Sequence, residues 1–194
     1  MAVSTQFEVP TWNQIYAMLL AQAKKIQTSK FQPDIIVGVA RGGLIPSRIL
    51  ADLLEIHDIA VIIIEYYIDI GKTLQEPVLK QCLTAPLTGK RVLLVDDVSD
   101  CGKSLQLAKE HLQTQEAAEI KVATLYSKPG TITKPDYFEK ETSCWIIFPW
   151  EYWETMRKIL QKPDCKRVAS QEVAKLVRAG FPKQLTQKFL KEMS

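Results

Sequence analysis

Hydrophobic and polar positions follow two different periods along the chain, and each period predicts one kind of element. Short apolar runs rich in β-branched residues predict strands at 35–40, 59–65, 91–95, 120–126 and 143–148. Apolar residues spaced three and four apart predict helices at 12–28, 44–55, 103–114, 170–179 and 182–192. Strands that alternate with helices predict an α/β fold with a doubly wound, mostly parallel sheet. Ligands of such sheets bind outside the carboxyl ends of the strands.

Two segments interrupt this alternation. Residues 66–89 contain scattered glycines and prolines, which is typical of an irregular or hairpin-like excursion that forms a lid over a site. After Pro163, Gly180 separates two short amphipathic helices. We therefore expect one domain over residues 1–162, with its lid, and a helical C-terminal extension over residues 163–194.

Composition narrows the class of protein. The chain has 194 residues, of which 46% are hydrophobic and 24% charged, and this excludes wholesale disorder. No apolar run is long enough to cross a bilayer, and the N-terminus does not have the pattern of a secretory signal. The four cysteines show no Cys-x-x-Cys spacing, which speaks against a zinc site or a disulfide framework. We expect a reduced, soluble, cytoplasmic protein without a membrane partner.

Charge is unevenly distributed. Residues 157–194 contain 10 Lys or Arg and 3 Asp or Glu, although the whole chain carries only +3. A basic tail could bind an anionic partner, or it could be a pair of solvated surface helices. The apolar stripes of both helices must be buried, either on the same domain or on a neighbouring subunit. We favour a structural or oligomer-stabilising role over nucleic-acid binding.

The segment 92–104 contains the most informative chemistry. An apolar strand brings Asp96 and Asp97 to its carboxyl end, and a turn with Gly102 then leads into a helix. Backbone N–H groups at such a helix start form a cradle for phosphate. The side chains that could add donors are Ser99, Lys103 and Ser104. Carboxylates beside a phosphate cradle suit a ligand that also offers sugar hydroxyls.

Two common phosphate motifs do not fit. A P-loop would need glycine at position 97, where this chain has aspartate. The dinucleotide pattern G-x-G-x-x-G does not match residues 38–43. The segment 92–104 instead resembles the phosphoribosyl diphosphate (PRPP) motif of type I phosphoribosyltransferases.

This resemblance implies roles for individual residues. Asp96 and Asp97 would hold or orient the ribose hydroxyls, the loop 99–104 would hold the 5′-phosphate, and Asp100 would act as general base toward the purine N7. Cys101 stands where the family usually has Thr or Ser, which removes one hydroxyl but no backbone donor. The PRPP-binding residues implied in this segment are Asp96, Asp97, Val98, Ser99, Asp100, Cys101, Gly102, Lys103 and Ser104.

A second segment, 39–43, resembles the pyrophosphate loop of the same family. Ala40, Arg41 and Gly42 would bind PRPP, and Arg41 would act in catalysis by contacting the leaving diphosphate. The resemblance also implies a cis peptide bond between Ala40 and Arg41.

Segments 126–130 and 145–151 resemble the base-binding end of 6-oxopurine members, closest to the bacterial xanthine–guanine and archaeal enzymes. Lys128 would donate to the purine O6, Trp145 would stack on the base, and the backbone of Ile146 would meet the purine edge. Glu151 stands where the family usually has Asp, which helps to hold a second Mg²⁺ through water. The metal-binding carboxylates so implied are Asp96, Asp97 and Glu151. Trp150 and Trp153 are expected to be structural.

The function implied is purine salvage, in which a purine base and PRPP give a nucleoside monophosphate and diphosphate, with Mg²⁺ as cofactor and a homodimer or homotetramer as assembly. Two alternatives stay open. The chain could be a PRPP- or nucleotide-sensing regulator that binds nucleic acid through its basic tail, or a phosphoribosyltransferase for another base. Within the lid, Lys72 or Lys80 could reach the diphosphate, although solvated lysines are the simpler interpretation.

Overall fold

The computed structural model describes residues 6–69, 72–83, 86–161 and 166–192. The chain divides into two compact units. The first, here called the sheet unit, comprises residues 16–67 and 73–143. The second, here called the terminal unit, is built from both ends of the chain, residues 1–15 and 144–194, together with residues 68–72. No helix in the described part of the chain is long and apolar enough to span a membrane.

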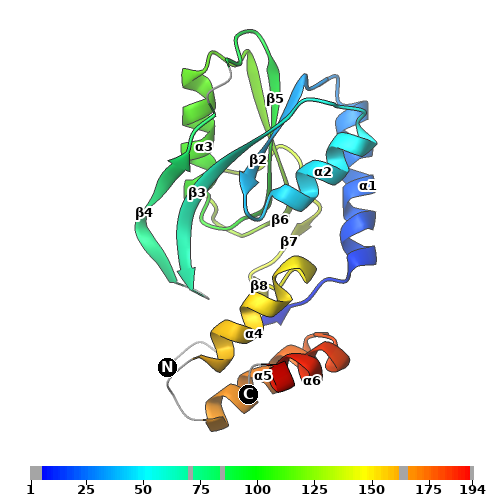
Figure 1. The fold of residues 1–194 in the computed structure, drawn as a ribbon. Coiled ribbons are helices and arrows are strands. Elements are labelled where there is room, and N and C mark those ends of the chain that lie inside the picture. Colours follow the sequence, from blue (N-terminus) through cyan, green and yellow to red (C-terminus); the bar gives the residue numbers. More distant parts are fainter. Residues whose placement is uncertain (1–5, 70–71, 84–85, 162–165, 193–194) are drawn as a thin grey trace. The chain divides into compact units, whose positions relative to one another are not determined.

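The sheet unit contains a six-stranded sheet in the order β4-β3-β2-β5-β6-β7 (Figure 1). Its strands are β2 (Ile35–Ala40), β3 (Ile59–Asp69), β4 (Lys72–Gln81), β5 (Arg91–Ser99), β6 (Glu119–Ser127) and β7 (Lys140–Glu141). The pairs β2–β3, β2–β5, β5–β6 and β6–β7 are parallel. The predicted doubly wound α/β fold is therefore confirmed.

Helices cover both faces of this sheet. They are α1 (Trp12–Thr28), α2 (Leu44–Leu53) and α3 (Lys103–Thr114), and α3 lies on the face opposite to α2 (Figure 1). Alternate residues of β2 point to opposite faces. Val37 joins the apolar cluster formed with Leu105 and Leu112 of α3, whereas Gly38 lies against Ser47 of α2. Because both faces are covered, the central strands are continuously apolar, which is why their positions were predictable.

An ion pair aligns the amino ends of the two central strands. Arg91, the first residue of β5, donates from its backbone N–H and from its guanidinium to Asp34, which precedes β2, over 2.8–3.1 Å. The same contacts hold the pKa of the Asp34 carboxyl near 2. This pair supports the register in which Ile35 lies opposite Val92.

The terminal unit has its own apolar core. Its elements are β1 (Phe7–Glu8), β8 (Trp145–Ile146), the 3-10 helix η1 (Pro149–Glu151), α4 (Tyr152–Leu160), α5 (Lys166–Arg178) and α6 (Lys183–Glu192). The buried residues of this core are Val9, Ile147, Met156, Ile159, Leu176 and Phe181. Val173 of α5 and Phe189 of α6 pack against it. The apolar stripes of the tail are therefore buried within the same chain, one of the two arrangements that the sequence allowed.

Several expected elements differ in the structure. The predicted strand at 143–148 is wrong: only Trp145–Ile146 is a strand, and it pairs with β1 outside the main sheet. The place beside β6 is taken by the two-residue strand β7. The strand predicted at 91–95 continues to Ser99, so Asp96 and Asp97 lie in the strand rather than in a turn. These differences arise because strand ends depend on partners that are distant in the sequence.

The lid region is more regular than expected. β3 and β4 extend it as consecutive strands, and β4 accommodates Pro77 because it lies at the edge of the sheet. Residues 70–71 and 84–85 of the predicted lid lie outside the described residues. The expected domain boundary at residue 162 stays a prediction, since residues 162–165 are also outside them.

Candidate functional site

The carboxyl ends of β2 and β5 are neighbours at the centre of the sheet. Gly38 lies opposite Val95 in this parallel pair, so Ala40 is level with Asp97. The chain continues from β2 toward β3 on one side and from β5 toward β6 on the other. Such a reversal of direction opens a crevice beyond the strand ends, where α/β proteins bind ligands. The two segments singled out in the sequence therefore meet at one place.

Residues 41–43 form a tight loop after β2. The Ala40–Arg41 peptide bond is cis, as expected. The Gly43 N–H donates to Val39 O over 2.8 Å, and the Leu44 N–H donates to Arg41 O over 3.2 Å, where α2 begins. A Cβ atom on Gly42 would lie within 3.0 Å of the Asp97 carboxylate, and one on Gly43 would lie equally close to Val95 O. Position 43 therefore needs glycine, a side chain at position 42 would displace the Asp97 carboxylate, and the loop backbone lies directly against β5.

The two carboxylates at the end of β5 have different surroundings. Asp97 lies against Gly42, whereas Asp96 is partly buried and accepts from the Asp97 N–H at 2.9 Å. Burial raises the pKa of the Asp96 carboxyl well above its usual range, although backbone N–H groups of Asp97 and Gly43 partly oppose this shift. A carboxyl that is costly to ionise gains from a ligand that brings positive charge or hydroxyl donors.

Asp96 and Asp97 are the carboxylates of this site that a metal ion could contact. In this part of the chain, His, Cys, Asp and Glu side chains form no group of three or more that could hold a metal ion. Two adjacent carboxylates fit Mg²⁺, which protein sites commonly hold through one or two carboxylates together with substrate phosphates. The arrangement thus suits a cation that arrives with a phosphorylated substrate.

The loop between β5 and α3 has the geometry of an anion cradle. β5 ends at Ser99, Gly102 caps α3 in the left-handed conformation at φ +86°, and the 12-residue helix begins at Lys103. The backbone N–H groups at the start of a helix point outward, and the helix dipole favours an anion there. Asp100 and Cys101 are partly exposed in this loop, as is Ser104 in the first turn of the helix.

Two side chains of this loop have partners that the sequence did not reveal. Ser99 is 1% exposed; its hydroxyl contacts Thr131 Oγ1 and donates to Thr133 O, both at 2.8 Å. Residues 131 and 133 thus hold this hydroxyl in the structure, and its role in binding phosphate stays a prediction. The Lys103 Nζ donates to Glu76 Oε1 at 2.8 Å, so it is held by β4 instead of pointing freely into the cradle.

Residues 128–133, here called the brace, pack against residues 99–104, here called the phosphate loop. The Lys128 N–H donates to Ser99 O at 2.8 Å, and the Ile132 N–H donates to Cys101 O at 3.0 Å. A Cβ atom on Gly102 would lie 2.5 Å from Thr133 N, so the two loops are in contact. This brace places Lys128 beside the residue that precedes Asp100. The sequence does not indicate this contact, because hydroxyl pairs such as Ser99 with Thr131 have no distinctive spacing.

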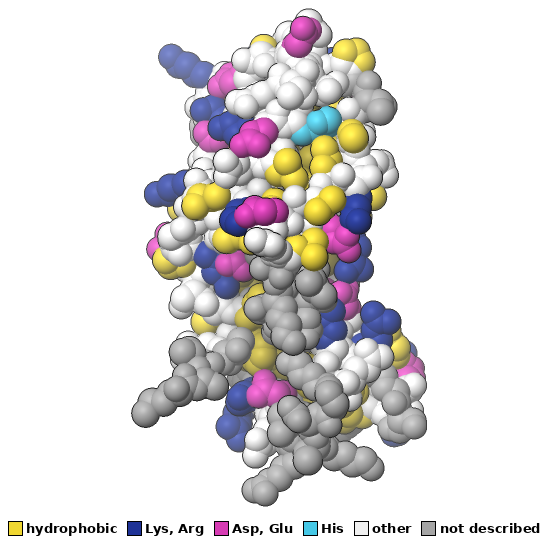
Figure 2. Space-filling model, turned by 90° about the vertical axis from the view of Figure 1, so that its left-hand side faces the viewer, with side chains coloured by type: hydrophobic (Ala, Val, Ile, Leu, Met, Phe, Trp, Pro, Cys, Tyr) yellow, Lys and Arg dark blue, Asp and Glu magenta, His cyan; other side chains and the backbone are white. Residues whose placement is uncertain are grey.

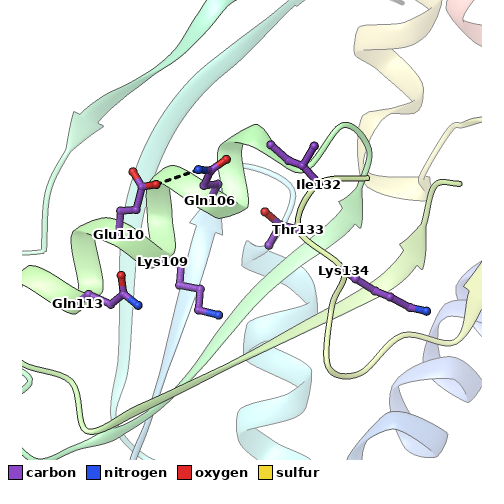
Figure 3. A pocket seen from close by; sticks show the side chains of 7 residues that line it. All are labelled: Gln106, Lys109, Glu110, Gln113, Ile132, Thr133 and Lys134. Carbon is purple, nitrogen blue, oxygen red and sulfur yellow. Dashed lines mark hydrogen bonds between the residues drawn. The ribbon is translucent and has the colours of Figure 1, made fainter. Parts of the chain in front are cut away.

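A pocket of about 600 Å³ lies on the far side of this brace, between α3 and residues 132–134 (Figure 3). Its lining residues are Gln106, Lys109, Glu110, Gln113, Ile132, Thr133 and Lys134. Gln106 donates to Glu110 at 3.0 Å within it. None of the predicted site residues lines this pocket, so it is separate from the candidate site.

The predicted base-binding residues Trp145 and Ile146 belong to the terminal unit. The N–H groups of Trp145 and Ile147 donate to Gln6 O and Glu8 O of the β1 segment, both at 2.8 Å. Ile146 lies between them and directs its backbone groups to the opposite edge of β8. The backbone of Ile146 is therefore oriented away from β1, as recognition of a base edge would require.

Glu151 has a local structural role. Its Oε1 accepts from the Phe148 N–H at 3.0 Å, where η1 begins. The carboxylate expected to help hold a second Mg²⁺ is thus bound to backbone, and that role stays a prediction. Trp150 stacks on Phe148 with ring centroids 4.8 Å apart, and Trp153 meets Phe189 edge-on at 4.9 Å, in line with structural roles.

A mostly parallel sheet with two carboxylates and a glycine-capped helix start at its carboxyl end is an α/β arrangement that suits a phosphorylated sugar or nucleotide. The family described as the phosphoribosyl transferase domain matches residues 11–156, and the chain belongs to this family.

Relatives and solved structures agree with this assignment. The chain is 34% identical over 143 residues to the xanthine-guanine phosphoribosyltransferase of Nitratidesulfovibrio vulgaris, which covers 73% of this chain and 82% of the relative. It is similar to the crystal structure of a purine phosphoribosyltransferase from Pyrococcus horikoshii, with a TM-score of 0.66, 41% identity and coverage of 74% of this chain and 93% of that one. A hypothetical protein from Neisseria gonorrhoeae with bound ppGpp gives a TM-score of 0.67 at 26% identity, over 88% of this chain and 99% of that one.

The contact between Gly102 and the brace leads to a prediction. Gly102→Ala combines a left-handed backbone, which costs a non-glycine residue about 1–2 kcal/mol, with a clash against Thr133. Gly89→Ala is the matched control, because Gly89 has φ +73° and open space around it. In urea unfolding, both variants should lose stability and Gly102→Ala clearly more. Calorimetry should show weaker PRPP binding only for Gly102→Ala. Equal losses in the two variants would mean that the loops are not tightly packed.

Proposed function

We propose that this protein transfers the 5-phosphoribosyl group from PRPP to a 6-oxopurine base, giving a nucleoside monophosphate and diphosphate. One observation carries the proposal. The β2–β5 register brings the Arg41 loop, the two carboxylates and the glycine-capped phosphate loop to the same end of the sheet. The similarity to xanthine-guanine phosphoribosyltransferases supports the choice of base.

Each of these groups would bind one part of PRPP. The N–H groups at the start of α3 would bind the 5′-phosphate. Asp96 and Asp97 would orient the ribose hydroxyls, and they are the carboxylates that we assign to Mg²⁺. When bound, Mg²⁺ would supply positive charge to the diphosphate. Arg41 and the amide of Gly42 would stabilise the charge that develops on this leaving group as the anomeric bond breaks.

The base would be recognised and activated by other residues. Asp100, which is partly exposed in the loop between β5 and α3, would take or share the proton of the incoming base. Lys128, placed by its backbone bond to Ser99, would donate to O6. The family resemblance assigns stacking on the base to Trp145 and contact with its edge to the backbone of Ile146, and both roles stay predictions. Exclusion of water would protect the cationic transition state from hydrolysis.

A base panel tests the function directly. The protein is incubated with PRPP, Mg²⁺ and, separately, adenine, guanine, hypoxanthine, xanthine and uracil, and nucleotide formation is followed by chromatography. We expect turnover with at least one 6-oxopurine and none with uracil. Turnover with uracil or adenine alone would contradict the proposed substrate class, and no turnover with any base would contradict the proposed activity.

A nucleotide-binding regulator is the second candidate function. The ppGpp-bound Neisseria protein is similar to 88% of this chain, and this part includes some of the tail outside the family match. Binding of ppGpp without turnover of any base would favour a sensor. Tail-dependent RNA or DNA binding that weakens steeply with salt would favour the nucleic-acid-binding form of that sensor.

Asp100→Asn should retain PRPP binding and lose most turnover. An amide cannot accept the base proton, and general acid–base groups typically contribute about 10²–10⁴ in rate. Calorimetry with PRPP and steady-state kinetics with the best base separate the two effects. Asp58→Asn, an exposed carboxylate paired with Lys90 at 3.3 Å, is the control and should behave as the unmodified protein. Unchanged turnover in Asp100→Asn would remove this residue from the mechanism.

Lys128→Ala should lower kcat/KM for 6-oxopurines by about tenfold or more, the contribution of one hydrogen bond from a charged donor. The preference for 6-oxopurines over adenine should also fall, because an ammonium donates to O6 but cannot accept from a 6-amino group. Kinetics with guanine, hypoxanthine and adenine measure both changes, and Lys24→Ala on the exposed side of α1 is the control. An adenine preference in the unmodified protein would refute this role.

A further inference from the structure

Hydrogen bonds connect the β3–β4 hairpin to α3 at two places. Near the start of the helix, the Lys103 Nζ donates to Glu76 Oε1 at 2.8 Å and lies 3.4 Å from Gln75 O. Near its end, the Leu83 N–H, just after β4, donates to His111 Nε2 at 3.0 Å. β4 runs beside α3 (Figure 1). The helix that begins in the phosphate loop therefore also holds the hairpin.

The two contacts differ in how exposed they are to solvent. Leu83 is buried in the apolar cluster under α3, so its bond to His111 anchors the base of the hairpin. The side chains of Lys103 and Glu76 are 36% and 70% exposed. Figure 2 shows this face of the molecule, where basic and acidic side chains lie next to one another at the surface. An exposed ion pair is weak and is readily exchanged for another partner.

Lys103 is also the first residue of α3 and directly follows Gly102. Its hydrogen bond to Glu76 raises the pKa of the ammonium, so the side chain stays charged. The ammonium that Glu76 holds toward β4 is the one that could donate to an oxygen of a phosphate bound at the start of α3. Glu76 and an anion in the cradle would thus compete for the Lys103 side chain.

We propose that Glu76 is an internal competitor that sets the affinity for PRPP: it holds Lys103 in the free protein and releases it to the 5′-phosphate when PRPP binds. This inference rests on the proposed function, since it requires PRPP in the cradle. Glu76 is then a positioning residue that acts through Lys103.

The size of the effect follows from the population of free Lys103. Apparent affinity falls by the fraction of molecules that are competent to bind. An exposed ion pair worth about 0.2–1 kcal/mol corresponds to roughly a 1.4- to fivefold change. Removal of the competitor should therefore tighten PRPP binding by up to about fivefold at low ionic strength, and by less at high ionic strength.

Calorimetric titration of PRPP with Mg²⁺ into four variants tests this. Glu76→Gln should bind PRPP more tightly, with the gain shrinking as salt is raised. Lys103→Met should bind it more weakly. The double variant Glu76→Gln/Lys103→Met should bind like Lys103→Met alone. Glu65→Gln is the matched control, because Glu65 pairs with Lys80 at 3.0 Å across the same hairpin and is similarly exposed. It should leave affinity unchanged.

The outcomes separate this inference from the function on which it rests. If the unmodified protein binds and turns over PRPP but Glu76→Gln behaves like Glu65→Gln, the competition is refuted and the function stands. A gain that persists in the Lys103→Met background would also refute it, since Glu76 would then act without Lys103. If the unmodified protein does not bind PRPP, both proposals fail.

Discussion

The parallel pairing of β2 with β5 is the constraint on which the candidate site depends. Its register makes Ala40 level with Asp97, and the Asp34–Arg91 pair supports it from the other end. Side chains alternate along a strand, so a shift of one residue would turn Asp97 away from Gly42 and bring its neighbours to the wrong face. The position of the site is thus set by the backbone hydrogen bonds between β2 and β5 and not by the side chains of the loops.

This constraint explains what could be predicted from the sequence. Buried parallel strands are continuous apolar runs, and Asp96 and Asp97 end one of them, so both the fold and the acidic strand end could be located. Gly102 at the start of a periodic helix indicated the phosphate loop in the same way. Each of these signals is local, and each depends on backbone geometry that only certain residues allow.

Features that depend on distant partners could not be predicted. The hydroxyl of Ser99 has its partners 32 and 34 residues away, and Lys103 reaches back 27 residues to Glu76. The strand at 145–146 pairs with residues 7–8, a connection that no pattern within either segment indicates. Glu151 accepts from the Phe148 N–H, a contact that the sequence did not indicate, and its role at a second Mg²⁺ stays a prediction.

The composition of the terminal unit has a consequence for how the protein is made. Tyr152 bridges the two ends of the chain: its hydroxyl donates to Pro10 O at 3.3 Å, and its ring packs 4.5 Å from that of Phe181. On a ribosome, residues 16–143 are complete while much of this core has yet to be translated, so the sheet can form while the N-terminal strand still waits for its partners. Prematurely terminated chains would then display phosphate-binding loops together with uncovered apolar residues such as Val9, a combination that chaperones and proteases would recognise as unfinished.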